Sequence, residues 1–393
     1  MAGRVLVIGG GIAGFAAALG AVAEGAEVTV VARAPGATAL YAGGMEIISG
    51  LDQIPTRDRH HPLARLGLDP VRLTAEMDDA VQAVVAALAR GGLRMTGDWR
   101  RPRSYADIHG MPRPAALVPD TVAAGELGAL HGRRVAVVDV AGIGEYDAAE
   151  AASALREISG LDAFTVPVSM PPLPPGGALT DIYGLPAPAV TERADAIAFP
   201  PGLTGLPPRG FELLASPPAP HGWRLQHALS RALAAAGVRF EAATVTSLRV
   251  ADGRALAAVG VGIEWEADSF VLATGRFIGG GLVGGRTVRE PLLELGVFFN
   301  DRPLAASAAR LKHLEYLSPA PAFRTGLRTD SDLRPQAPDG LPPLENLRAA
   351  GSVLGGYDYG AGAGFGVPIL TGWIAGRLAA RPERAAAIRG VAR

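Results

Sequence analysis

Residues 4–36, "RVLVIGGGIAGFAAALGAVAEGAEVTVVARAPG", carry the clearest structural pattern in the chain. They read as an apolar strand, a glycine turn, a helix over 12–24 and a second strand, "VTVVA". Gly9, Gly11 and Gly14 have the spacing of the G-x-G-x-x-G dinucleotide fingerprint. Such glycines permit a tight turn, close approach of the backbone to a diphosphate, and close packing of helix on strand. The segment predicts a Rossmann-like βαβ unit that holds phosphate at the N-terminus of its helix.

The end of the second strand departs from that fingerprint. An Asp or Glu there normally bonds the ribose hydroxyls of an adenosine, but this chain has Ala32 and Arg33. Three interpretations follow: Arg33 holds the 2′-phosphate of NADP, other groups hold the adenosine of FAD, or the cofactor lacks the adenosine half, as FMN does. This position alone leaves all three open.

Composition limits the classes of function. The chain has 393 residues, 49% hydrophobic and 19% charged, with a net charge of −1, which fits a globular enzyme of about two to three domains and no nucleic-acid partner. It has no cysteine, which excludes disulfides and a cysteine-ligated iron–sulfur cluster within the chain. There is no run of about 18 apolar residues and no secretory signal pattern, so we expect a cytoplasmic protein. The seven histidines are scattered, and we expect no metal site.

The pattern of elements indicates a discontinuous domain. Helical periodicity over 71–91, a strand over 134–140 and a helix over about 146–158 fall in the middle of the chain. Helices over 222–237 and about 367–380 belong to the later part, with short strands and hairpin turns between 238 and 275. We predict an α/β fold in which 1–50 and 216–393 form one domain and 51–215 form an inserted cap or substrate-type domain.

The later part of the chain favours a flavin. In "VLATGRFIGGG" (271–281) an apolar strand leads to a Thr-Gly pair beside the first loop, and in "AAGSVLGGYD" (349–358) a strand ends in Gly-Ser. A helix that opens at "GFGVP" (364–368) would direct free N–H groups toward the pyrimidine edge of a flavin, where negative charge develops on reduction. These pieces, in this order, predict a Rossmann-like three-layer flavin-binding domain.

The same stretches resemble a known family, the B subunits of the anaerobic glycerol-3-phosphate dehydrogenases. The resemblance rests on "VLATGRFIGGGLVGGRTVREPLLEL", "TDSDLRPQ", "ENLRAAGSVLGGYD" and "IGGGIAGFAAAL" followed by "VVARAPGATALYAGGMEIISG". It covers both ends of the chain and the middle only loosely. It implies a flavoprotein described as carrying FMN, whereas the glycine fingerprint by itself favours FAD.

The resemblance also implies partners and a reaction. The family works with a catalytic A subunit that carries a flavin and with a membrane-associated iron–sulfur C subunit. Together they oxidise glycerol 3-phosphate to dihydroxyacetone phosphate and pass electrons toward quinone, so membrane attachment is expected only through a partner. The alternatives are a stand-alone FAD-dependent dehydrogenase of the fumarate-reductase type and a non-catalytic scaffold in a redox complex.

The pattern and the resemblance together predict a set of site residues. For catalysis the chain offers only His109, in a glycine-proline loop, and Arg289, in the shared "VREP" stretch. Gly142 and Gly144 resemble a second phosphate loop, but a strand-to-helix turn is the preferred interpretation because the third glycine is missing. The predicted cofactor-binding residues are Gly9, Gly11, Ile12, Ala13, Gly14, Arg33, Gly43, Gly44, Thr274, Gly275, Gly351, Ser352, Gly364, Phe365 and Gly366.

Overall fold

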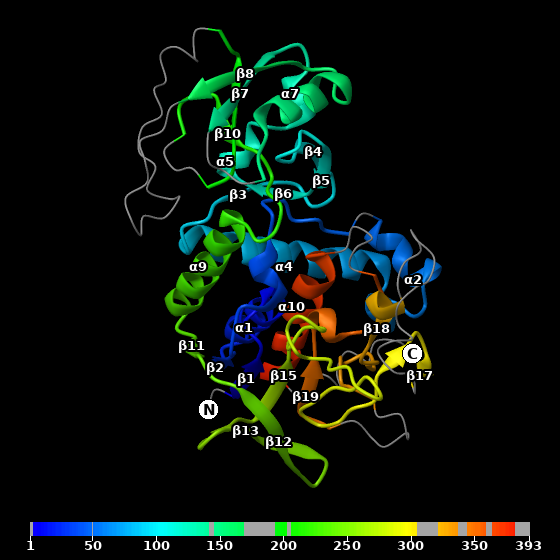
Figure 1. Cartoon of the computed structure of the whole chain (residues 1–393). Helices are drawn as coiled ribbons and strands as arrows, with labels where there is room; N and C mark the ends of the chain where they lie inside the picture. Colours follow the sequence, from blue (N-terminus) through cyan, green and yellow to red (C-terminus); the bar gives the residue numbers. More distant parts are fainter. Residues whose placement is uncertain are drawn as a thin grey trace. The chain divides into compact units, whose positions relative to one another are not determined.

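The computed structural model describes residues 3–48, 50–140, 145–168, 193–202, 206–304, 321–336, 344–358 and 364–381. The chain divides into two compact units (Figure 1). The first comprises Met1–Thr38, Ile48–Gly92 and Ala228–Arg393, and the second comprises Ala39–Ile47 and Leu93–His227.

The first unit is built on a parallel sheet of five strands in the order β11-β2-β1-β15-β19. The apolar segment around the glycine fingerprint supplies its centre, and the C-terminal part of the chain supplies β15 and β19. The strands are β1 (Arg4–Ile8), β2 (Glu27–Val31), β11 (Arg239–Glu241), β15 (Ser269–Leu272) and β19 (Leu347–Ala349). The parallel order confirms the predicted discontinuous Rossmann-like sheet.

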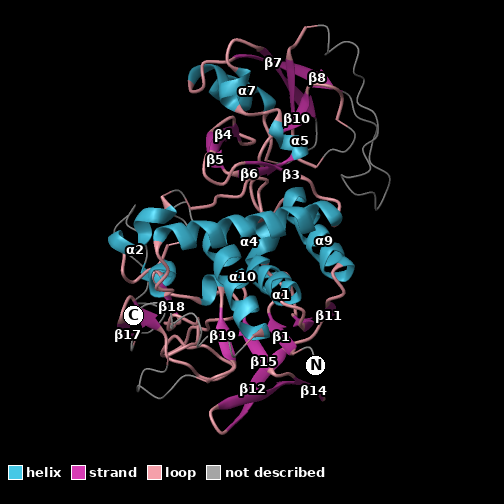
Figure 2. Ribbon diagram, turned by 180° about the vertical axis from the view of Figure 1, so that it is seen from behind, coloured by secondary structure: helices cyan, strands magenta, loops and turns pink. Residues whose placement is uncertain are grey.

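Helices cover one face of this sheet and an antiparallel sheet covers the other (Figure 2). Gly14 of the first helix lies on the side chain of Val7, which marks the helical face. Trp265 of the antiparallel sheet donates through Nε1 to Glu241 on the opposite face, at 2.6 Å. The layers are α1 (Ile12–Ala23), α4 (Pro70–Arg90) and α10 (Gly366–Ala380) on one side, and β12 (Val245–Ala251), β13 (Arg254–Gly260) and β14 (Ile263–Glu266) on the other.

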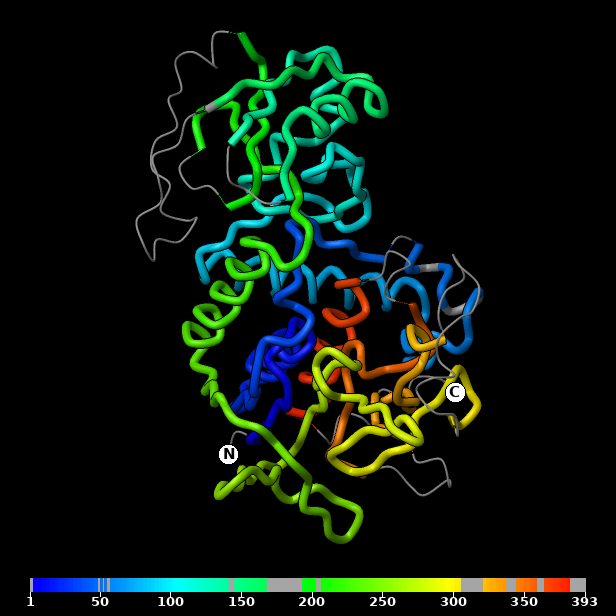
Figure 3. The backbone as a smooth tube through the Cα atoms, in the orientation of Figure 1, coloured from blue at the N-terminus to red at the C-terminus, as the bar shows by residue number. Residues whose placement is uncertain are grey.

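The first and last helices of the sheet domain pack with their backbones in contact, as the chain trace shows (Figure 3). A Cβ added to Gly372 would lie 2.4 Å from the carbonyl oxygen of Ala13, and one added to Gly376 would lie 1.9 Å from that of Ala17. Side chains larger than hydrogen would therefore push α10 away from α1. This close contact brings the N-terminal turn of α10 to the same edge of the sheet as the glycine loop.

Short elements complete the first unit. They are η2 (Leu51–Gln53), α2 (Ile54–Arg57), α3 (Pro62–Arg65), β16 (Phe298–Phe299), β17 (Arg302–Pro303), η5 (Pro321–Arg324), β18 (Thr325–Gly326) and η6 (Gly351–Val353). The short helix η1 (Gly36–Leu40) begins in the first unit and ends in the second. Helix α9 (Pro220–Ala235) begins in the second unit and ends in the first.

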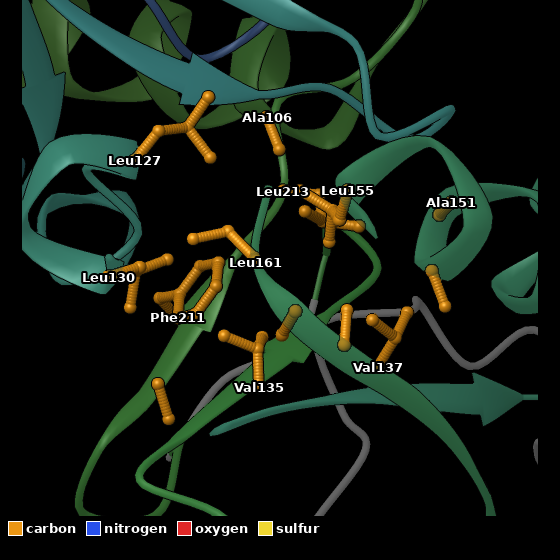
Figure 4. Packing of buried hydrophobic residues seen from close by; sticks show 14 of the residues in the cluster. Ala106, Leu127, Leu130, Val135, Val137, Ala151, Leu155, Leu161, Phe211 and Leu213 are labelled. Atoms are coloured by element: carbon orange, nitrogen blue, oxygen red, sulfur yellow. The ribbon is translucent and has the colours of Figure 1, made fainter. Parts of the chain in front are cut away.

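The second unit has its own parallel sheet, in the order β10-β9-β7-β8. Its core gathers apolar side chains of the sheet and of α7, among them Val135, Leu155 and Phe211 (Figure 4). The elements are β3 (Met95–Gly97), β4 (Arg103–Ala106), β5 (Pro112–Ala115), β6 (Leu117–Pro119), α5 (Asp120–Ala123), α6 (Leu127–Leu130), β7 (Arg134–Val140), α7 (Ala148–Glu157), β8 (Asp162–Val168), β9 (Ala196–Phe199) and β10 (Gly210–Glu212).

The two compact units have boundaries that differ from the predicted domains. Residues 51–92, predicted to lie in the insert, fall in the first unit because α4 packs against α10 and α1. Residues 39–47 fall in the second unit, where Met45 bonds the backbone of Leu117. The cap role of the insert stays a prediction, and Gly142 and Gly144 lie outside the described residues. In the described part of the chain, no helix combines the length and the apolar character needed to cross a membrane.

Candidate functional site

The glycine loop lies at the carboxyl end of β1 and is fixed by both neighbouring strands. The N–H of Gly9 donates to the carbonyl of Val31 in β2 at 2.9 Å, and Ala273, after β15, donates to Ile8 at 2.8 Å. Gly9 has φ of 125°, and a Cβ there would lie 2.2 Å from the carbonyl oxygen of Ala273. Only glycine fits this turn.

Helix α1 begins directly after the loop, so its N-terminus lies at the loop predicted to hold the diphosphate. Gly11 is the N-cap, in extended conformation and without a side-chain cap, and the first turn holds no acidic residue. A Cβ on Gly14 would lie 1.9 Å from the carbonyl oxygen of Gly9, so the helix packs directly on the turn. This combination of close backbone and helix N-terminus is an anion-binding arrangement.

Thr38 belongs to this arrangement, although the sequence pattern did not single it out. Its buried Oγ1 accepts the N–H of Ile12 at 2.9 Å, and the hydroxyl keeps its own hydrogen as a donor. A Cβ on Gly11 would lie 3.1 Å from the same oxygen. The signal available in the sequence was a hydroxyl residue a few positions after the second strand, in "PGATAL".

The residues after β15 lie against the same loop. The Oγ1 of Thr274 is buried and has no hydrogen-bond partner among the described residues. Gly275 has φ of 75°, and a Cβ on it would lie 3.7 Å from Oγ of Ser352. The structure therefore brings the predicted Thr-Gly and Gly-Ser pairs together, with an unsatisfied hydroxyl between strand and loop that a ligand can bond.

Gly351 connects this edge of the sheet to both helices. A Cβ on it would lie 2.4 Å from the Cβ of Ala13, in the first turn of α1. Its N–H donates to Oγ1 of Thr371 at 2.9 Å, and that hydroxyl donates to the carbonyl of Val367 at 2.6 Å. Helix α10 starts here, with Phe365 as an N-cap that makes no side-chain cap bond. Gly364 and Gly366 flank Phe365, so the predicted helix opening lies beside the predicted loops.

Arg276 holds the turn in which Gly351 and Ser352 lie. Its Nε and Nη2 donate to the carbonyls of Ser352 and Leu354, each at 2.9 Å, and its Nη1 donates to that of Phe323. Its guanidinium also lies 5.5 Å from the ring centroid of Tyr357. Arg276 is thus a positioning residue for the turn.

Arg33, Gly43 and Gly44 complete the set of predicted cofactor residues. Arg33 is exposed after the end of β2. Gly43 and Gly44 belong to the second unit, where the carbonyl of Gly43 accepts the hydroxyl of Tyr41 at 2.7 Å. A Cβ on Gly43 would lie 2.8 Å from Cδ2 of His221. Their contact with a cofactor stays a prediction.

The side chains of both catalytic candidates are exposed to solvent in part. His109 is in the second unit, partly exposed, with Nδ1 3.8 Å from Oε2 of Glu150. Arg289 is exposed in the first unit and pairs with Glu294. Neither geometry identifies a catalytic acid or base, and both assignments stay predictions.

Burial changes the titration of two histidines. Burial lowers the pKa of His61 to about 4, and its Nδ1 accepts the N–H of Leu63 as the N-cap of α3. Burial also lowers the pKa of His221, which is enclosed in the second unit. Both rings are therefore neutral near pH 7. Among the described residues, no group of three or more His, Asp or Glu side chains is arranged to hold a metal ion.

Comparison with known proteins identifies the family. The model of the FAD binding domain matches residues 4–141 and 82–367. A probable B subunit of anaerobic glycerol-3-phosphate dehydrogenase from Halobacterium salinarum is 32% identical, over 96% of this chain and 97% of that protein. The chain belongs to the family of anaerobic glycerol-3-phosphate dehydrogenase B subunits. The corresponding B subunit of Yersinia pseudotuberculosis is 28% identical, over 92% and 94% of the two chains.

A solved structure is also similar to this B-subunit family member. The 3-ketosteroid delta1-dehydrogenase from Sterolibacterium denitrificans is 16% identical, with a TM-score of 0.45, and the match covers 96% of this chain and 99% of that one. The matched domain and the relatives make the chain a flavin-dependent dehydrogenase, and the match to an FAD binding domain favours FAD as its flavin.

The residues around the glycine loop fit FAD. Gly9 and Gly14 let the turn and the helix pack directly on neighbouring backbone, and Thr38 adds a hydroxyl beside Gly11 at the start of α1. The buried Oγ1 of Thr274 is a polar group that no described residue bonds, as expected where a ligand completes a site. Of the three interpretations that the strand end left open, the FAD-binding match favours the second, in which other groups hold the adenosine.

Proposed function

We propose that this chain is the B subunit of a complex that oxidises glycerol 3-phosphate to dihydroxyacetone phosphate. In this proposal it works with a catalytic A subunit that carries a flavin and with an iron–sulfur C subunit, which pass electrons to quinone. The observation that carries the proposal is the length of the match. Relatives named as B subunits align over 97% and 94% of their own length, so the likeness is not confined to the nucleotide-binding loop.

The chain's own residues prepare the flavin position. Oxidation of a secondary alcohol releases two electrons and two protons, and FAD supplies the acceptor for the electron pair when bound. The start of α1 and Thr38 would hold the diphosphate, and Arg276 keeps the Gly351–Leu354 turn in place. The N-terminus of α10 would stabilise negative charge on a flavin ring bound beside it, because the partial positive charge of a helix lies at its first N–H groups.

In this proposal the electrons leave through another chain. The 393 residues contain no cysteine, so a cysteine-ligated cluster cannot belong to this polypeptide. In the proposed complex, a cysteine-ligated one-electron relay therefore belongs to a partner protein.

The test is glycerol 3-phosphate-dependent reduction of a water-soluble quinone analogue, by the chain alone and by the chain co-expressed with candidate A and C subunits. Turnover by the complete complex is expected. Gly9→Ala in this chain should abolish quinone reduction by the complex. Gly25→Ala is the matched control and should leave it unchanged, because the φ of Gly25 is also positive, 81°, and a Cβ there meets no atom within 4 Å.

Two outcomes would contradict the proposal. Turnover of a different small substrate by the isolated chain with an artificial acceptor would indicate a stand-alone dehydrogenase. A complex whose activity is unchanged by Gly9→Ala would indicate that the chain is a scaffold.

A further inference from the structure

The missing ribose acid is not supplied by the neighbouring strand. The N–H of Ala32 donates to the carbonyl of Glu241 at 3.0 Å, so the ends of β2 and β11 lie side by side. The carboxylate of Glu241, however, accepts Nε1 of Trp265 at 2.6 Å, on the face covered by β14. It thus points away from the helical face, on which the glycine loop and α1 lie.

Phe240 occupies the helical face at this edge. In the parallel register of β11 and β2, Phe240 lies opposite Val30, and alternating residues of a strand point to opposite faces. A Cβ built on Gly10 would lie 3.5 Å from Cε2 of Phe240 and 2.9 Å from the Cβ of Ala32. The ring therefore stands beside the diphosphate loop, next to the small residue that replaces the acid.

The ring is also accessible. Phe240 is 43% exposed, although it adjoins a loop with buried residues on both sides. An aromatic face that is partly open to solvent, beside a dinucleotide loop, suits a flat heteroaromatic ligand, because bases stack on aromatic side chains without needing a specific hydrogen bond.

We propose that Phe240 stacks on the adenine of FAD and that this contact replaces the missing ribose acid, which makes Phe240 the residue that selects FAD over FMN. FMN has the ribityl phosphate but no adenine, so it can use the glycine loop and Thr38 but gains nothing from Phe240. The proposal rests on the flavin site and not on the substrate of the proposed function.

The test is a set of affinities measured on the apo-protein. FAD and FMN are titrated by the change in flavin fluorescence, and ADP is titrated by competition with FAD. Phe240→Ala should weaken FAD and ADP by about fivefold to a hundredfold, the range that alanine substitution of a stacking aromatic gives, and should leave FMN unchanged. Phe240→Trp should retain the affinity for FAD. Trp223→Ala removes an exposed aromatic from the other unit and should change none of the values.

Two results would overturn the proposal. Unchanged FAD affinity in Phe240→Ala would show that the ring does not contact the adenine. An equal loss for FAD and FMN would show that the ring only supports the loop, and where FMN binds too weakly to measure, inorganic pyrophosphate is the adenine-free competitor. A failure of glycerol 3-phosphate oxidation would not alter these affinities, so the two proposals fail separately.

Discussion

Gly351→Ala tests whether the turn before α10 must lie directly on the first turn of α1. Gly351 has φ of 79°, and a Cβ on it would lie 2.4 Å from the Cβ of Ala13, well inside ordinary carbon contact. A Cβ atom is attached directly to the backbone, so neither the new Cβ at position 351 nor that of Ala13 can move aside by rotating a side chain. The turn or the helix must therefore move.

The expected cost has two parts. A non-glycine residue in the left-handed region costs about 1–2 kcal/mol. Overpacking of a tight contact adds about 1–3 kcal/mol. Gly237→Ala separates the two, because its φ is 74° and a Cβ there meets nothing within 4 Å. We expect a loss of unfolding free energy of about 2–5 kcal/mol for Gly351→Ala and only the first part for Gly237→Ala.

The assay is urea unfolding of the apo-protein, followed by titration with FAD. Gly351→Ala should also weaken FAD by about tenfold or more, since about 1.4 kcal/mol of lost contact is a factor of ten, whereas Gly237→Ala should not. Adding Ala13→Gly to Gly351→Ala removes the overlapping methyl group. The double variant should regain the unfolding free energy that overpacking costs the single variant. It should lose about 1 kcal/mol of this gain because glycine destabilises a helix. A loss of the same unfolding free energy and FAD affinity in Gly351→Ala and Gly237→Ala would refute the reasoning. Losses of Ala13→Gly and Gly351→Ala that simply added in the double variant would also refute it.

Two further predictions concern buried polar groups. Thr38→Val removes the acceptor of the Ile12 N–H and should weaken FAD by an amount equivalent to about 1–3 kcal/mol, while Thr38→Ser should stay near wild type; equal affinities of the two variants in a fluorescence titration would contradict the assigned hydroxyl role. The second concerns pH. The pKa of His61 is about 4 in the folded chain because the ring is buried, against about 6.5 when unfolded. The unfolded chain therefore binds the proton first, so the stability that neutral His61 provides is complete above pH 6.5 and is lost as the pH falls toward 4, by about 2 kcal/mol at pH 5. The difference between the urea midpoints at pH 7 and pH 5 should be smaller in His61→Asn than in wild type. The same difference in both proteins would show that the buried His61 does not cause the loss of stability at low pH.

The sequence predicted the elements whose patterns are local. Helix α1 and strand β7 lie at or within one residue of the expected 12–24 and 134–140, because glycine and apolar runs mark their ends. Helix α10 was expected at about 367–380 and spans Gly366–Ala380. Strand β9 was missed, since its alanine-rich sequence, "AIAF", shows neither alternation nor β-branched enrichment, although all four residues are buried.

Features that depend on distant contacts could not be predicted. The periodicity of α4 shows that one face is buried but not that the face packs on α10, so the helix was assigned to the insert. Thr38 and Phe240 became visible only when the structure placed them beside the glycine loop. The missing acid after β2 was evident from the sequence, but what compensates for it lies on a strand more than 200 residues later.

The most direct measurement is identification by mass of the flavin released from the purified chain, together with its visible spectrum. A chain that binds the dinucleotide through its glycine loop should be yellow and release FAD. Release of FMN would mean that the loop grips a single phosphate, and a colourless chain that takes up neither flavin on reconstitution would contradict the assignment of a flavin site altogether.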